Sequence, residues 1–147
     1  MRIVLQRVTS ASVKVDGNIT GKIDTGFLLL FGVGHEDTEE DCRRLADKIS
    51  GLRIFSDEND KINLDLSSVG GKLLVVPQFT LYADCRKGRR PGFSGAAAPE
   101  TADPLYRRYS ELLKENGVEK VERGIFGADM LVRLENDGPA TFLLESK

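Results

Sequence analysis

The chain has 147 residues, with 21 Lys and Arg residues against 23 Asp and Glu residues and a formal net charge of −2. This length is typical of one domain, so the sequence predicts a single domain over residues 1–147. The near-neutral charge excludes a globally basic nucleic-acid-binding protein, and a contact with RNA or DNA would need a local basic patch. No apolar run approaches the about 18 residues of a membrane span, and the N-terminus becomes polar too early for a signal peptide, so we expect a cytoplasmic protein.

The N-terminal part of the chain has the pattern of strands. Segments 2–7 and 11–15 are predicted strands, residues 16–17 (Asp-Gly) form a strong hairpin turn signal, and 19–23 is predicted to be the returning strand. The continuous apolar run 26–33 has strand length and is typical of a strand buried on both faces.

A helix is predicted over 38–50. Thr38 followed by Asp41 resembles a capping box at its start. One apolar stripe then repeats at helical spacing, which places one of the two cysteines in the core. The residues of this stripe are Cys42, Leu45, Ala46 and Ile49.

The next elements are predicted to be short strands at 52–55 and 61–64 and a stronger strand at 73–82. Residues 86–103 show no period, and we predict a long ordered loop, which in a compact domain is usually functional or disordered.

A second helix is expected after Asp103 as its cap and Pro104 as its first residue, and Asn116-Gly117 should end it. Its predicted inner face carries Leu105, Tyr109 and Leu112, and strands follow at 118–123, 128–135 and 141–145. The order is therefore two strands, two β–α units and three strands. This order predicts an α/β fold with a mixed three-layer β/β/α arrangement.

The sequence lacks the motifs of common catalytic sites. His35 is the only histidine, and no motif supports it as a general base, so we interpret it as a loop or cap residue. Cys85 precedes a basic run that would lower the pKa of a thiol, but no base stands near it in sequence. No metal-binding spacing occurs, and we expect no metal and no cofactor.

The segment 75–81 is unusual for a strand. Alternation places Gln78 and Thr80 on one face, with Phe79 on the other. Because Pro77 cannot donate to the ladder, we expect the backbone N–H groups of residues 78–80 to be free for a ligand, such as a developing oxyanion. A solvated edge strand is the simpler interpretation, and on spacing alone it is the favoured one.

Two further segments allow two interpretations each. Arg86, Lys87, Arg89 and Arg90 form a local cationic run that would suit a phosphate backbone or would simply be a solvated loop. Residues 136–141 (Asn-Asp-Gly-Pro-Ala-Thr) have the composition of an ordinary turn between two strands.

Six short segments are weak one at a time but occur in order over the whole chain. They are 6–13 (QRVTSASV), 53–57 (RIFSD), 78–81 (QFTL), Arg90-Pro91 with Phe93, 126–130 (FGADM) and 136–141 (NDGPAT). In this order and at these separations they resemble the D-aminoacyl-tRNA deacylases, from one end of the chain to the other.

The resemblance implies a cytoplasmic homodimer that hydrolyses the ester of D-aminoacyl-tRNA and of glycine mischarged on tRNA, with neither DNA nor a membrane as partner. It implies a catalytic segment at Gln78, Phe79 and Thr80, and a cis Gly138–Pro139 dipeptide that enters the site of the other subunit. Phe126 and Met130 become candidates for contacting the terminal adenosine, and Arg86, Lys87, Arg89 and Arg90 for contacting phosphates. The family usually has Ser where this chain has Pro77, so no role is carried over to that position.

Two mechanisms fit this resemblance. In the first, backbone N–H groups near Phe79 and Thr80 hold the ester carbonyl and the 2′-hydroxyl of the tRNA assists, because an aminoacyl ester is already activated. In the second, Thr80 is a covalent nucleophile, although the sequence shows no base to activate it. Two non-enzymatic interpretations also stay open. The protein would be either a module that binds the tRNA 3′ end without turnover or a small structural dimer.

Overall fold

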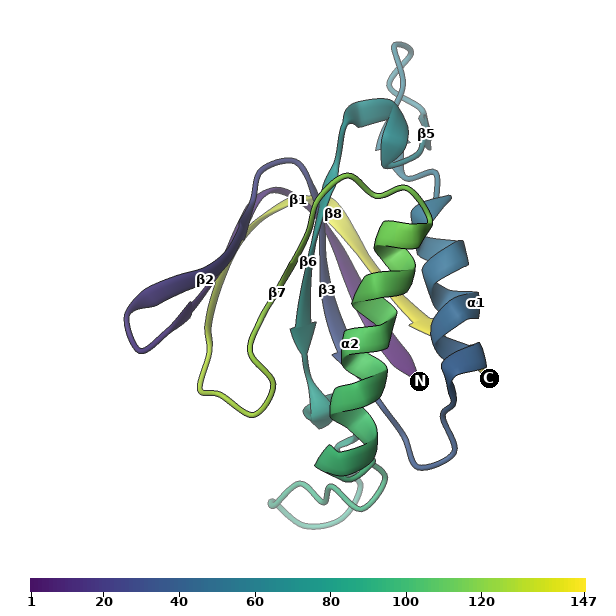
Figure 1. Cartoon of the computed structure of the whole chain (residues 1–147). Coiled ribbons are helices and arrows are strands. Elements are labelled where there is room, and N and C mark those ends of the chain that lie inside the picture. Colours follow the sequence, from purple (N-terminus) through teal and green to yellow (C-terminus); the bar gives the residue numbers. More distant parts are fainter.

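Two helices lie side by side on one face of a six-stranded sheet (Figure 1). The computed structural model describes all residues, 1–147. The sheet runs in the order β2-β1-β3-β6-β7, β8 pairs with β1, and the β3–β6 and β6–β7 pairs are parallel. The strands are β1 (Arg2–Val15), β2 (Asn18–Ile23), β3 (Gly26–Gly32), β4 (Phe55–Ser56), β5 (Ile62–Leu64), β6 (Lys72–Pro77), β7 (Val121–Arg123) and β8 (Leu131–Glu145); the helices are α1 (Glu39–Ser50) and α2 (Pro99–Glu115), with 3-10 turns η1 (Ser67–Val69) and η2 (Phe79–Tyr82).

The central strand β3 is buried on both faces, as its apolar run predicts. Phe27, Leu29 and Phe31 pack under the helices in the larger core, whereas Leu28 faces a second, smaller core. That second core is closed by side chains from β2, from the second half of β1 and from the first half of β8. The helices, the central strands and this folded-over part of the sheet make three layers, which confirms the predicted β/β/α arrangement.

The predicted strands 2–7 and 11–15 are in fact one strand, β1, and 128–135 and 141–145 are one strand, β8. The β1–β8 register shifts twice, between Gln6 and Val8 and between Val8 and Ser10. Such irregularities bend and twist a strand without ending it. As a result β1 lies beside β3 with its first half and beside β2 with its second half.

Local signals predicted the first hairpin and α1 correctly. Asp16 and Gly17 both have positive φ, of 49° and 80°, as a two-residue turn of this kind requires. At the start of α1, the Asp41 carboxylate accepts hydrogen bonds from the Thr38 backbone N–H at 2.9 Å and from the Thr38 hydroxyl at 3.1 Å.

The second helix starts earlier than predicted. Its first residue is Pro99, Ala98 precedes it in extended conformation, and Pro104 lies inside the helix. Both prolines are acceptable first residues by sequence, and the extended φ and ψ of Ala98 are those that a following proline favours. Asp103 does not cap the helix but pairs with Arg107 one turn later at 3.0 Å. The predicted loop 86–103 is therefore shorter than expected.

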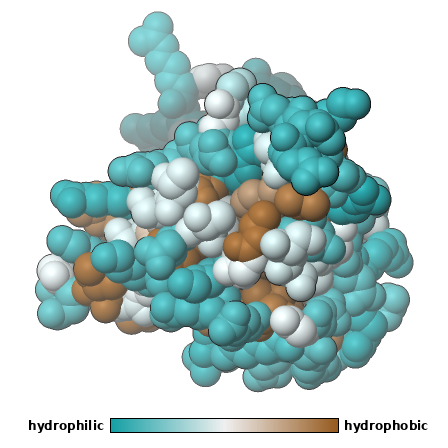
Figure 2. All heavy atoms as spheres, turned by 90° about the horizontal axis from the view of Figure 1, so that it is seen from above, coloured by the Kyte–Doolittle hydropathy of each residue, from teal (hydrophilic) through white to brown (hydrophobic).

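The short elements also differ in length from their predictions. The segments 52–55 and 61–64 form only the two-stranded β4–β5 pair, and 118–123 contributes only Val121–Arg123 to the main sheet. Neither helix is long and apolar enough to cross a membrane. Viewed from above, hydrophobic surface forms patches surrounded by hydrophilic surface (Figure 2).

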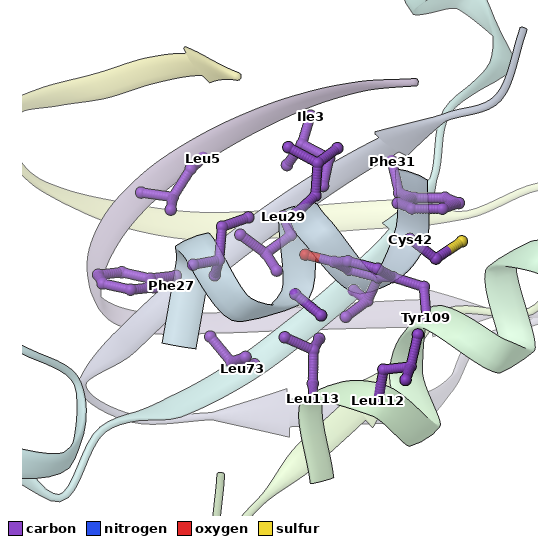
Figure 3. Packing of buried hydrophobic residues seen from close by; sticks show 14 of the residues in the cluster. Ile3, Leu5, Phe27, Leu29, Phe31, Cys42, Leu73, Tyr109, Leu112 and Leu113 are labelled. Atoms are coloured by element: carbon purple, nitrogen blue, oxygen red, sulfur yellow. The ribbon is translucent and has the colours of Figure 1, made fainter. Parts of the chain in front are cut away.

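Tyr109 of α2 is fully buried against the ring of Phe31, with the two ring centroids 4.6 Å apart (Figure 3). Its hydroxyl has no hydrogen-bond partner, and burial raises the pKa of this group well above the ordinary value. A buried donor without a partner costs free energy, so Tyr109→Phe should raise the free energy of unfolding by about 1 kcal/mol. Urea unfolding measures this, and a lower stability of the variant would show that the hydroxyl has a partner.

Candidate functional site

Strand β6 stops at Pro77, five residues before the predicted end of the strand at 82 and inside the unusual segment 75–81. Pro77 is the last residue of β6 that is paired with β3, and Gln78 then leaves the extended region with φ −145° and ψ 76°. The residues from Phe79 form the 3-10 turn η2. The expected alternation of Gln78 and Thr80 on one strand face is therefore wrong, because the chain coils before a second face can form.

The turn leaves two backbone donors uncommitted. The Gln78 N–H donates to the Phe31 carbonyl at 2.7 Å, so the expectation that this group is free is wrong. The first hydrogen bond within the turn is donated by Leu81 to the Gln78 carbonyl, at 3.2 Å. The N–H groups of Phe79 and Thr80 come before it and have no acceptor in the turn, as at the start of any helix.

The side chains of the same segment add a polar pair. The Gln78 amide contacts the Thr80 hydroxyl in a very short hydrogen bond. The hydroxyl therefore has a neutral amide as its partner, and a neutral amide does not remove a proton. Phe79 is 56% exposed, and its ring meets the ring of Phe93 edge-on with centroids 5.1 Å apart.

A cavity of about 640 Å³ opens beside η2. Most of its lining is apolar, and Asp129 is the one charged residue in it. Two of the three predicted catalytic residues, Gln78 and Phe79, line it, as do both predicted adenosine contacts, Phe126 and Met130. The remaining lining residues come from β3 and Val33 just after it, from β6, β8 and α2, and from the segments 93–97 and 126–130.

Tyr106 of α2 fixes the floor of this cavity. Its hydroxyl lies 2.9 Å from the Val75 carbonyl and 2.8 Å from the Gly124 carbonyl, and burial raises the pKa of the phenol. A Cβ at Gly124 would lie 2.7 Å from the Met130 sulfur, so a larger residue here would displace the Met130 side chain that lines the cavity. Sequence reasoning assigned no role to Tyr106. Its spacing of three residues from Tyr109 was the available signal, since it places both tyrosines on the inner face of one helix.

The Gly138–Pro139 dipeptide lies in the middle of β8, exposed and outside the cavity of its own chain. Its peptide bond is cis, the form that the resemblance implies. The segment is held in place, because the Asn136 amide donates to the carbonyls of Arg7 and Ala140 at 2.9 and 3.0 Å. Arg7 in turn donates to the Asp137 carbonyl at 2.9 Å. The interpretation of 136–141 as a turn between two strands is wrong, because β8 continues through it.

The cationic residues lie on a loop next to the cavity and not in it. The loop is closed by two backbone hydrogen bonds between Asp84 and Gly92, of 2.7 and 2.9 Å. Arg86 folds back on Asp84 at 2.7 Å, and its hydrogen bonds hold the pKa of that carboxyl below the ordinary value. The other three cations of this loop, Lys87, Arg89 and Arg90, are exposed and make no ion pair within the chain.

The residues that sequence reasoning set aside are also outside the cavity. His35 contacts the Ser94 carbonyl at 2.6 Å in the loop between β3 and α1. Cys42 is buried as predicted, and burial raises the pKa of its thiol to about 12. Cys85 is exposed on the cationic loop. No group of three or more His, Cys, Asp or Glu side chains is arranged to hold a metal ion.

Comparisons with known proteins agree over the whole length of the chain. The family model for D-Tyr-tRNA(Tyr) deacylase matches residues 4–145. Proteins named D-aminoacyl-tRNA deacylase are 56% identical in Bacillus velezensis, over 100% of this chain and 99% of the relative, and 57% identical in Clostridioides difficile, over 99% and 97%.

Two solved structures share the fold. A protein described as the c-Myc DNA Unwinding Element Binding Protein superposes with a TM-score of 0.93 at 38% identity, over 100% of this chain and 99% of the other. A probable eukaryotic D-amino acid tRNA deacylase superposes with a TM-score of 0.80 at 21% identity, over 97% of both chains, and shows the fold alone. The resemblance seen in the sequence is confirmed, and the chain belongs to the D-Tyr-tRNA(Tyr) deacylase family of hydrolases.

Proposed function

We propose that this protein hydrolyses the ester bond that joins a D-amino acid, or glycine, to the 3′ end of tRNA. The observation that carries the proposal is the pair of uncommitted N–H groups of Phe79 and Thr80 beside an apolar cavity. Backbone donors held in a fixed turn are suited to an ester carbonyl oxygen that becomes negative as water attacks, and one such donor is worth about 3 kcal/mol.

The reaction needs only water and a route for protons. Water adds to the carbonyl carbon, the bond to the ribose 3′-oxygen breaks, and that oxygen leaves with a proton, which gives free tRNA and the amino acid. The neighbouring 2′-hydroxyl of the tRNA assists the proton transfer in this proposal. The partner of the Thr80 hydroxyl favours this route over a Thr80 nucleophile, because the Gln78 amide is not a base.

Chiral selection is proposed to come from a second copy of the chain. Gly138 and Pro139 are exposed and do not line the cavity beside η2 of their own chain, which suits a role in the site of a partner in a homodimer. A wall near the α-carbon would admit a D side chain, or the hydrogen of glycine, and would clash with an L side chain. Leu131 and Leu143 of β8 are 57% and 64% exposed on the single chain, which supplies apolar surface for such a partner.

The rest of the tRNA end is proposed to contact the cavity lining and the cationic loop. Phe126 and Met130 offer an apolar surface to the unstacked terminal adenosine. The loop offers positive charges to the phosphates, with tRNA and not DNA as the nucleic acid. The cytoplasm, where aminoacyl-tRNA is made and used, is the proposed location.

The deciding experiment incubates D-tyrosyl-tRNA and L-tyrosyl-tRNA separately with catalytic amounts of protein and follows release of the amino acid. We expect many turnovers with the D-substrate and glycyl-tRNA and almost none with the L-substrate. Protection of the ester without release would instead favour a binding module. Duplex DNA added as competitor should leave the rate unchanged, and strong inhibition by it would contradict tRNA as the specific partner.

Removing the unpaired charges of the cationic loop should weaken the binding of tRNA without lowering kcat. The triple variant Lys87→Ala, Arg89→Ala, Arg90→Ala is expected to raise KM and to lower the slope of log KM against log salt by about 2, if all three charges meet phosphates. An unchanged slope would show that the loop is only solvated. A charge-matched control removes three exposed lysines elsewhere on the surface: Lys48, Lys61 and Lys114.

A further inference from the structure

The turn η2 is fixed at its start by the sheet but needs other contacts at its end. The hydrogen bond from Gln78 to the Phe31 carbonyl continues the pairing of β6 with β3 as far as the first residue of the turn. Beyond it the turn has four residues, and no strand or long helix continues from it. The directions of the Phe79 and Thr80 N–H groups therefore depend on what holds Leu81 and Tyr82.

Arg2 of β1 holds this end from one side. Its guanidinium donates to the Leu81 carbonyl at 3.1 Å and lies 4.7 Å from the centre of the Tyr82 ring. The same guanidinium is paired with Glu145 of β8 at 2.8 Å, which limits its movement. A cation at the carbonyl end of a helical turn is also electrostatically favourable.

Asp37 holds the turn from the other side. The Tyr82 hydroxyl donates to the Asp37 carboxylate at 3.2 Å, and burial raises the pKa of Tyr82, so the phenol stays a donor. Asp37 is itself buried and accepts the Gly34 N–H at 2.6 Å and a hydrogen bond from the Met1 amino group. Gly34 has no room for a Cβ, which would lie 2.9 Å from the Tyr82 ring.

The residues around Gly34 also hold a second part of the cavity lining. Gly34 forms an isolated bridge with Ala96, and the Ala97 N–H donates to the Val33 carbonyl at 2.9 Å. Ala96 and Ala97 line the cavity, as Phe79 does. One cluster of contacts therefore holds both the turn η2 and this second part of the cavity lining.

We propose that Arg2, Asp37 and Tyr82 are positioning residues of the deacylation reaction, which act by fixing the orientation of the Phe79 and Thr80 N–H groups. The inference rests on the proposed function. None of the three lines the cavity, so none is expected to contact the aminoacyl group. Because donors must meet the carbonyl oxygen within a fraction of an ångström, a loosened turn should slow the chemical step and leave tRNA binding intact.

The test compares Tyr82→Phe, which removes one hydroxyl, with Tyr82→Ala, which removes both contacts of the side chain. For D-tyrosyl-tRNA we expect kcat to fall about 3-fold and about 30-fold respectively, with KM within about 2-fold of the wild type. Arg2→Ala should also lower kcat, and Arg2→Lys should restore most of it, since a lysine can still reach the Leu81 carbonyl. A purely structural role would instead reduce the amount of folded protein and leave kcat per folded molecule unchanged.

Ser146→Ala is the control within the same cluster. It removes the hydroxyl that accepts from the Met1 amino group at 2.9 Å, and it has no contact with η2. We expect its thermal midpoint to fall and its kcat to stay unchanged. Unchanged kcat in both Tyr82 variants, or an equal loss of kcat in Ser146→Ala, would overturn the inference alone. A wild-type protein that hydrolyses no aminoacyl-tRNA would overturn the proposed function, and the inference with it.

Discussion

Replacing Phe79 by proline is expected to lower kcat for D-tyrosyl-tRNA about 100-fold below that of Phe79→Ala. Both variants lose the aromatic ring, but only proline removes the backbone N–H. The backbone accepts proline here, because Phe79 is the first residue of a 3-10 turn and Gln78 before it is not helical. The ratio of the two kcat values therefore measures the donor itself.

Two further results would decide between the mechanisms. If Phe79→Pro and Phe79→Ala had equal kcat, the Phe79 N–H would not serve the reaction. Thr80→Val keeps the backbone and removes the hydroxyl, and we expect its kcat to stay near that of the wild type. A loss in Thr80→Val as large as that expected for Phe79→Pro would favour Thr80 as a nucleophile, and single-turnover experiments would then show an acyl-enzyme.

Gly138→Ala should lower the hydrolysis of D-tyrosyl-tRNA at least about 10-fold and raise the ratio of L- to D-activity. A Cβ at this position would lie 2.4 Å from the Asn136 side-chain oxygen and 2.5 Å from the Ala140 backbone nitrogen. The second of these atoms is backbone and cannot rotate away, so the whole dipeptide must move. If the wall stands near the α-carbon, its displacement alters which enantiomer fits. The measurement is the pair of initial rates with D- and L-tyrosyl-tRNA.

Gly51→Ala is the matched control for this substitution. Gly51 has φ −102°, and a Cβ there would have no neighbour closer than 3.8 Å. Its D- and L-rates should equal those of the wild type. If Gly138→Ala hydrolysed each substrate at the same rate as the wild type, the dipeptide would be excluded as the chiral wall. Its position in the middle of β8 would then have no functional explanation.

The local patterns of the sequence predicted those elements that local energies decide. The apolar run of β3, the Asp16-Gly17 turn and the Thr38 cap of α1 each depend on residues close in sequence, and each is found as predicted. The order of the six motifs identified the family, which the comparisons confirm.

Predictions of element boundaries failed where two local signals were equivalent, or where contacts with a distant segment determined the boundary. Pro99 and Pro104 are both acceptable first residues of a helix, and α2 starts at Pro99, with Ala102 as a buried residue of its first turn. The segment 73–82 is apolar enough for a strand throughout, but β3 offers pairing partners only as far as Phe31, so the ladder stops at Pro77.

The sequence by itself determined the α/β class, the membership of the family and the segments that could carry chemistry. Only the tertiary structure decided that η2 leaves two N–H groups free, and that Phe79, Phe93 and Phe126 share one cavity. It also placed Asp37 behind the turn and Gly138 outside the cavity. The physical reason is that a periodic pattern records which face of an element is buried, whereas contacts between segments far apart in the chain depend on how the bent sheet packs on itself and under its helices.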